Sequence, residues 1–140
     1  MKANFNKYGK ICDDIKRKDP YADFRIIEKL GKGGFGAVYA GYRNSDHFPV
    51  AIKVINKSKL DPEDLESLKN EVRLMQQVDH PNIVKYYETY DDSKYIYLCM
   101  ELCTGGELFE KVTKRKKPFS EGEAAEVMRD LLKALQHCHS

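Results

Sequence analysis

The stretch LGKGGFGAV, residues 30–38, is followed after a short turn by VAIK, residues 50–53. Glycines at positions 31, 33 and 36 have the spacing G-x-G-x-x-G, which lets a tight loop bring backbone N–H groups against a polyphosphate because no Cβ blocks the approach. Dinucleotide-binding folds use the same spacing, but there the last glycine opens a helix. Here residues 37–42 have the pattern of a strand, and residues 50–55 form a second β-rich run with a lysine inside it. We therefore predict that the loop lies between two strands of a hairpin.

Composition restricts the class of protein. A chain of 140 residues is long enough for one domain with a hydrophobic core, and 41% hydrophobic with 33% charged residues is typical of a soluble globular protein. Lysine and arginine outnumber aspartate and glutamate by 24 to 22, so the charge indicates neither a nucleic acid nor a membrane as partner. No stretch approaches the roughly 20 apolar residues that span a bilayer. We expect an intracellular, cytoplasmic protein, with the nucleus as an alternative.

The cysteine pattern argues against a metal site. Cys12, Cys99, Cys103 and Cys138 contain no C-x-x-C pair, and no histidines have the spacing that would complete a zinc site. We expect reduced thiols and no metal ligands in this chain.

A helix is predicted after the lysine strand, with Asp61 at its N-cap and Pro62 in its first turn. Its apolar residues recur at helical spacing: Leu65, Leu68, Val72, Met75 and Val78. Glu71 falls inside this apolar arc, where an unpaired charge costs several kcal/mol to bury, so we predict an ion pair with Lys53. Asp64 lies on the same arc, but the helix dipole and solvent can satisfy it in the first turn.

The rest of the chain completes an α+β pattern. Further strands are expected at residues 24–30, 83–90 and 95–100, with His80 in a turn that holds local backbone. Together with the hairpin they give a five-stranded antiparallel sheet and one helix. A short helix at residues 107–115 and a longer one, opened by a capping box at Ser120 and Glu123, then follow. The longer helix has an apolar stripe with little to cover it.

The pattern G-x-G-x-x-G-x-V at residues 31–38, followed by VAIK, resembles the amino-terminal part of a protein kinase domain. Residues 1–22 are polar and have no apolar periodicity, so we expect a loosely ordered arm there. The resemblance implies a kinase small lobe at residues 23–100. It also implies a hinge at residues 101–106 and a truncated large lobe at residues 107–140.

ATP and Mg²⁺ are the ligands that this resemblance implies. Lys53 would contact the α- and β-phosphates, and Glu71 would hold the lysine in place. Glu101 and Cys103 would present backbone groups to the adenine, and Glu107 would reach the ribose or a basic residue of a peptide substrate. The implied ATP site comprises Leu30, Gly31, Lys32, Gly33, Gly34, Phe35, Gly36, Ala37, Val38, Ala51, Lys53, Met100, Glu101, Cys103 and Glu107.

The family's H-R-D loop and D-F-G aspartate, which supply the base and the metal ligands, would lie beyond Ser140. The family therefore implies an ATP-dependent serine/threonine kinase, whereas the isolated chain is expected to transfer phosphate negligibly. The alternative is a non-catalytic nucleotide-binding or interaction fragment.

Two stretches narrow the resemblance. TGGELFE at residues 104–110 and PFSEGEAA at residues 118–125 resemble the calcium/calmodulin-regulated kinases, especially the calcium-dependent kinases. This subgroup implies a protein substrate with a basic residue before the acceptor, and regulation by calcium or calmodulin. No D-x-D-x-D-G calcium loop occurs in these residues, so that regulation would involve other sequence.

Overall fold

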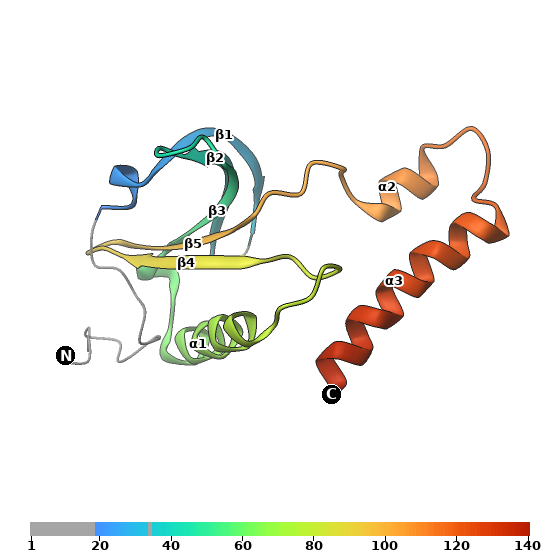
Figure 1. Ribbon diagram of the computed structural model, residues 1–140. Helices are drawn as coiled ribbons and strands as arrows, with labels where there is room; N and C mark the ends of the chain where they lie inside the picture. Colours follow the sequence, from blue (N-terminus) through green and yellow to red (C-terminus); the bar gives the residue numbers. More distant parts are fainter. Residues whose placement is uncertain (1–18, 34) are drawn as a thin grey trace. The chain divides into compact units, whose positions relative to one another are not determined.

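A five-stranded antiparallel sheet with one helix against it forms the first part of the protein (Figure 1). The computed structural model describes residues 19–33 and 35–140. The strand order is β1-β2-β3-β5-β4. The bounds are Phe24–Lys32 for β1, Gly36–Arg43 for β2, Pro49–Asn56 for β3, Tyr86–Asp91 for β4, Tyr95–Glu101 for β5 and Pro62–Gln77 for helix α1. The predicted α+β class is confirmed.

The arm expected at residues 1–22 lies mostly outside the described residues. Its last part, Pro20–Ala22, is a short 3-10 helix, η1. The Asp19 side chain caps it by accepting a hydrogen bond from the Tyr21 N–H at 3.0 Å. This turn leads directly into β1.

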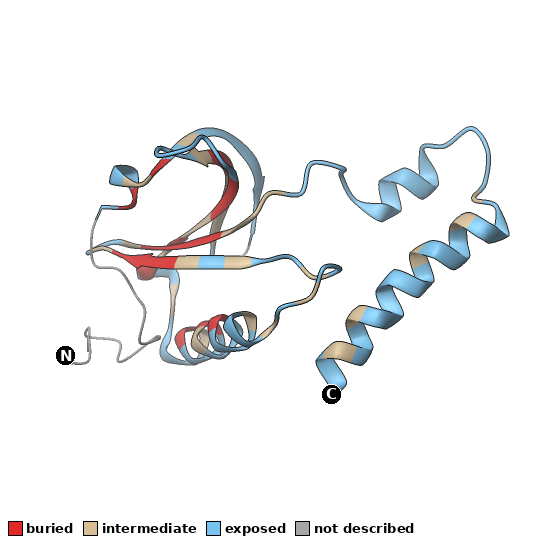
Figure 2. Ribbon diagram, in the orientation of Figure 1, coloured by how far each residue is buried: buried red, intermediate tan, exposed pale blue. Residues whose placement is uncertain are grey.

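Strand β3 lies in the middle of the sheet, and its two faces carry separate hydrophobic clusters. The first cluster joins the sheet to α1 and contains Ile55, Leu65, Leu68, Val72, Ile96 and Leu98. The second lies on the opposite face and contains Phe24, Val50, Ile52, Tyr90, Tyr97 and Cys99. Figure 2 shows the buried residues concentrated on β3, β5, the end of β4 and one side of α1. The alternation of side chains along β3 explains why one strand serves both clusters.

The start of α1 is fixed by two aspartates that cap each other's backbone. The Asp64 N–H donates to the Asp61 carboxylate at 2.8 Å, and the Asp61 N–H donates to the Asp64 carboxylate at 3.3 Å. Asp61 is thus the predicted N-cap. Asp64 was expected only to be satisfied by the helix dipole and solvent. In the structure it also caps the Asp61 N–H, which completes a reciprocal arrangement like that of a capping box.

Strand β4 begins later than predicted because a turn occupies its expected first residues. The Ile83 N–H donates to the His80 carbonyl at 3.1 Å, and the His80 ring nitrogen Nδ1 accepts from the Asn82 N–H at 3.0 Å. His80 therefore holds local backbone, as expected. The residues from 83 to 85 are consequently outside the strand.

The chain divides into two compact units. The first unit contains the sheet and α1, and its last segment is Lys85–Leu102, which carries β4 and β5. The second unit consists of Val78–Val84 and Cys103–Ser140. The second unit contains two helices, α2 (Leu108–Thr113) and α3 (Glu121–His139).

Helix α3 begins with the capping box that the sequence predicts. Ser120 Oγ accepts from the Glu123 N–H at 3.1 Å, and the Glu123 carboxylate accepts from the Ser120 N–H at 2.8 Å. Within the same unit the Asn82 side chain donates to the Asp130 carbonyl at 3.0 Å. The apolar stripe of α3 is largely exposed, as expected, and includes Met128, Leu131, Leu132 and Leu135 (Figure 2). No helix among the described residues is both long and apolar enough to cross a membrane.

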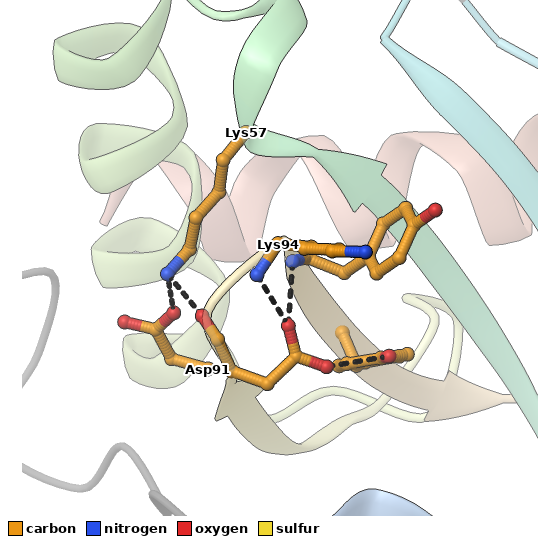
Figure 3. Close-up of polar contacts among 6 residues, drawn as sticks. Lys57, Asp91 and Lys94 are labelled. Atoms are coloured by element: carbon orange, nitrogen blue, oxygen red, sulfur yellow. Dashed lines mark hydrogen bonds and ion pairs between the residues drawn. The ribbon is translucent and has the colours of Figure 1, made fainter.

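A buried ion pair joins Lys57, directly after β3, to Asp91, the last residue of β4 (Figure 3). Lys57 begins the short helix η2, Lys57–Lys59, and its side chain is buried. Its ammonium contacts the buried Asp91 carboxylate and donates to the Asp92 carbonyl at 2.5 Å. The Lys57 N–H also donates to the Lys94 carbonyl at 2.9 Å. The connection that leads into α1 is therefore attached to the sheet at both backbone and side chain.

The Asp92 side chain stabilises the turn between β4 and β5 from within. Its carboxylate accepts from the N–H groups of Lys94 and Tyr95 at 2.7 Å and from the Tyr97 hydroxyl at 2.8 Å. Burial opposes the charged form, but these hydrogen bonds outweigh it and lower the pKa of Asp92.

Replacing Lys57 tests how much this buried pair contributes. Lys57→Met keeps the length of the side chain but leaves the buried Asp91 carboxylate without its cation, which should lower the free energy of unfolding by about 3–5 kcal/mol. Lys114→Met is the matched control, because Lys114 contacts Glu110 at 3.0 Å and the two side chains are 74% and 51% exposed. That surface pair should contribute less than about 1 kcal/mol. Urea denaturation measures both changes, and equal losses would contradict the assignment.

Candidate functional site

Four residues of the predicted ATP site lie in two adjoining rows of the sheet. Lys53 of β3 is the register partner of Val38 in β2 and of Leu98 in β5. Two residues earlier on β3, Ala51 is the register partner of Met100 in β5. Cross-strand partners point to the same face, and so do residues two apart on one strand. Val38, Ala51, Lys53 and Met100 therefore share one face of the sheet.

Helix α1 packs on this same face. Ile55 follows Lys53 by two residues, so it points to the same side, and it belongs to the cluster with Leu68 and Val72 of α1. Lys53 itself is half-buried, between the buried Ala51 and Ile55. Its ammonium makes no hydrogen bond or ion pair with any residue that the structure describes. The chain thus carries a cation in an otherwise apolar part of its central strand.

Glu71 departs from the expectation that it is directed into the core. Its side chain is exposed, whereas its neighbour Val72 is fully buried. Among the described residues no ion pair joins Glu71 to Lys53. The physical reason is that Glu71 lies at the margin of the buried stripe formed by Leu65, Leu68 and Val72, where its carboxylate stays hydrated and needs no partner. The helix and the lysine nevertheless occupy the same side of the sheet.

The glycine loop joins β1 to β2, and its glycines differ in what surrounds them. A Cβ at Gly36 would lie 1.8 Å from the Val54 carbonyl oxygen, so only glycine fits against β3 there. A Cβ at Gly31 would have nothing within 4 Å, and one at Gly33 would meet only the Gly36 oxygen at 3.9 Å. Packing within the chain therefore accounts for Gly36 but not for Gly31 or Gly33.

Hydrogen bonds hold both ends of the loop. The Gly33 N–H donates to the Gly36 carbonyl at 2.8 Å, and the Asn56 N–H donates to the Phe35 carbonyl at 3.2 Å. The Gly33 amide is therefore already engaged inside the loop, and a phosphate would have to be bound by other N–H groups. Gly34 lies outside the described residues. The loop residues Leu30, Gly31, Lys32, Gly33 and Phe35 are exposed, whereas Gly36, Ala37 and Val38 are half-buried.

The expected hinge begins where β5 ends. The Glu101 N–H donates to the Lys85 carbonyl at 2.8 Å, and the Glu101 carboxylate accepts from the Lys85 N–H at 3.0 Å. Burial and the nearby Glu101 charge raise the pKa of Tyr87. Sequence reasoning assigned Glu101 a backbone role only and missed this side-chain contact. The sequence signal that could have indicated this contact is an acidic residue directly after the apolar run of β5.

Two further predicted site residues belong to the second unit. Cys103 is exposed with a free thiol. Glu107 is the N-cap residue of α2, but its side chain makes no capping hydrogen bond. Its exposed carboxylate therefore stays accessible to a ligand.

No group of three or more histidine, cysteine, aspartate or glutamate side chains among residues 19–33 and 35–140 could hold a metal ion. The side chains gathered around Lys53 can contribute a cation and an apolar surface. They suit the binding of an anionic, partly apolar ligand such as a nucleoside triphosphate.

Comparison with known proteins identifies the family. Residues 24–140 match the protein kinase domain. The chain belongs to the protein kinase family, as its glycine loop and VAIK sequence predict.

Its relatives include calcium-dependent kinases. It is 46% identical to Calcium-dependent protein kinase 5 of Plasmodium falciparum over 99% of this chain and 25% of the relative. The Plasmodium berghei protein of the same name is also 46% identical, over 80% of this chain and 19% of the relative. The Calcium/calmodulin-dependent protein kinase type II alpha chain of Drosophila melanogaster is 38% identical over 84% of this chain and 22% of the relative. The chain therefore spans a quarter or less of the length of these relatives.

The unequal surroundings of the glycines predict unequal effects of substitution. Gly36→Ala places a Cβ against the Val54 carbonyl and should lower the free energy of unfolding by about 1–3 kcal/mol, because backbone must shift. Gly31→Ala meets open space and should change it by less than about 0.5 kcal/mol. Urea denaturation of the two variants checks this, and a Gly31→Ala loss as large as that of Gly36→Ala would contradict the assigned packing.

Proposed function

We propose that this chain is the ATP-binding part of a serine/threonine protein kinase that transfers the γ-phosphate of ATP to hydroxyl groups of proteins. The observation that carries the proposal is the half-buried Lys53, which lies between Val38 and Leu98 and has no anionic partner among the described residues. An ammonium in such surroundings is stabilised by an anion that approaches from outside the fold. The triphosphate of a nucleotide is such an anion.

The apolar neighbours of Lys53 support the adenosine end of the same ligand. Val38, Ala51 and Met100 share its face, and Leu30, two residues before the end of β1, would complete the adenine slot. Glu101 and Cys103 would present backbone groups to the adenine edge. Glu107 would bind the ribose or a basic residue of the substrate.

The glycine loop would cover the phosphates. Gly31 and Gly33 have no neighbours that require glycine, so the missing Cβ atoms leave room for a ligand rather than for the chain itself. Residues 31–38 would act through backbone N–H groups other than that of Gly33, or through opening of the Gly33 to Gly36 hydrogen bond.

Glu71 would act as a positioning residue for the lysine. It is carried by the helix that packs on the Lys53 face, and its exposed carboxylate is free to turn. We infer that Glu71 approaches Lys53 when the nucleotide is bound, because the triphosphate fixes the lysine and a carboxylate then restrains its other side.

Catalysis needs groups that these 140 residues do not contain. Mg²⁺, when bound with ATP, supplies neutralisation of the developing phosphate charge, and its ligands in this family come from the H-R-D and D-F-G loops. Neither sequence occurs here. The residues present would bind and orient the nucleotide, while the aspartate base and the metal ligands would come from elsewhere in the whole protein.

The relatives' names suggest the mode of regulation. Two are called calcium-dependent and one calcium/calmodulin-dependent. We propose that the whole protein responds to calcium or calmodulin through sequence outside these residues. We also propose that Glu107 favours protein substrates with a basic residue before the acceptor.

Lys53→Met tests the nucleotide site. Loss of a charge-assisted contact of about 1.5–3 kcal/mol should weaken ATP binding roughly 10- to 100-fold. Isothermal titration calorimetry of the 140-residue chain measures the affinity, with Lys133→Met on α3 as the matched control that removes an exposed lysine. Equal affinities in the unsubstituted chain and Lys53→Met would contradict the proposed role.

A phosphotransfer assay separates nucleotide binding from catalysis. With radiolabelled ATP, Mg²⁺ and a basic peptide substrate, the 140-residue chain should show no turnover above background, because the base and metal ligands are missing. Robust turnover that disappears in Lys53→Met would refute the division of roles proposed here.

A further inference from the structure

A cavity lies on the sheet face opposite Lys53. It has a volume of about 190 Å³, and its walls include the aromatic residues Phe35, Tyr39 and Tyr95. Three lysines line it: Lys29 from β1, Lys32 from the end of β1 and Lys59 from η2. All three are exposed.

The strand register proves that this cavity is distinct from the nucleotide face. Val54 lines the cavity and directly follows Lys53, so their side chains point to opposite faces. Ala37 and Tyr39 also line it, and they flank Val38, the partner of Lys53. The sheet therefore separates the two places: Lys53 lies on one face and the cavity with the three lysines on the other.

Some cations among the described residues are neutralised by an acidic side chain close by. Arg43 pairs with Asp46 at 2.6 Å, Lys114 with Glu110 at 3.0 Å and Arg115 with Glu123 at 2.9 Å.

By contrast, Lys29, Lys32 and Lys59 make no ion pair with any described residue, and none of the described residues that line the cavity is a carboxylate. Three like charges around one concave opening repel each other unless an anion joins them. The site is thus complementary to a compact anion of more than one charge.

We propose that this cavity binds the phosphate group of a phosphoserine or phosphothreonine in a partner protein. A phosphate monoester carries close to two negative charges at pH 7 and three acceptor oxygens, which matches several ammonium donors around one opening. Phe35 and Tyr95 provide apolar surface for the residues next to the modified side chain. A single carboxylate has one charge and would leave most of the lysine charge uncompensated.

The distribution of charge favours a peptide over a nucleic acid. Nucleic acids are bound by basic residues that follow a phosphate backbone over many ångströms. Here three cations meet at one cavity, and the formal net charge of the whole chain is only +2. The proposal does not depend on ATP binding, because none of its argument uses the Lys53 face.

The test uses a fluorescein-labelled heptapeptide with a central phosphoserine between two leucines. Fluorescence anisotropy with the 140-residue chain should show saturable binding, and the unphosphorylated peptide should bind at least about tenfold more weakly. The double variant Lys29→Glu/Lys59→Glu should lose affinity for the phosphopeptide by about tenfold or more. Thermal unfolding of the variant checks that these exposed substitutions leave the fold intact.

Two further variants serve as controls. Lys133→Glu makes the same charge change on α3 and should leave the affinity within about twofold, because Lys133 does not line the cavity and salt screens an exposed charge. Lys53→Met should also bind the phosphopeptide within about twofold, since residues 53 and 54 face opposite sides. This last variant separates failure of the phosphopeptide site from failure of the nucleotide site.

Three outcomes would overturn the proposal. They are an absence of saturable binding, equal affinity for the phosphorylated and unphosphorylated peptides, and equal affinity of the unsubstituted chain and the double variant. A single-stranded oligonucleotide that binds more tightly than the phosphopeptide and depends on the same two lysines would also overturn it, in favour of nucleic acid.

Discussion

The central constraint is the position of one ammonium group in the middle strand of an apolar sheet. Pairing of β3 with both β2 and β5 places Lys53 between Val38 and Leu98, and the packing of Ile55 against α1 fixes which face it shares. An isolated cation there lowers the stability of the sheet unless it is solvated or neutralised. The proposed nucleotide function turns this local disadvantage into a binding site.

Features that depend on neighbouring residues could be predicted from the sequence. The hairpin around the glycine loop, the Asp61 cap and the Ser120 capping box each involve residues only a few positions apart, so the pattern contains all the information needed. The family followed from the same short motifs, and the match over residues 24–140 confirms it. The phosphate-binding role that the spacing suggests for Gly31 and Gly33 stays a prediction, although their surroundings are open.

Features that join distant parts of the chain could not be predicted. The Lys57 and Asp91 pair and the Glu101 and Lys85 contacts depend on how β3, β4 and β5 are aligned, which no local pattern specifies. Helical periodicity placed Glu71 on the apolar arc of α1. It could not predict how much of that arc the sheet covers. In the structure the sheet covers Val72 but leaves Glu71 exposed. The lysine cavity likewise depends on strand register.

The most direct test is to observe the Lys53 side chain while ATP is added. Lysines labelled with ¹³C at Cε give one NMR signal each, and the signal missing from Lys53→Arg identifies Lys53. We predict that this signal shifts in a saturable way with ATP and Mg²⁺ while the Lys133 signal stays in place. Saturable ATP binding with no change at Lys53 would contradict the account.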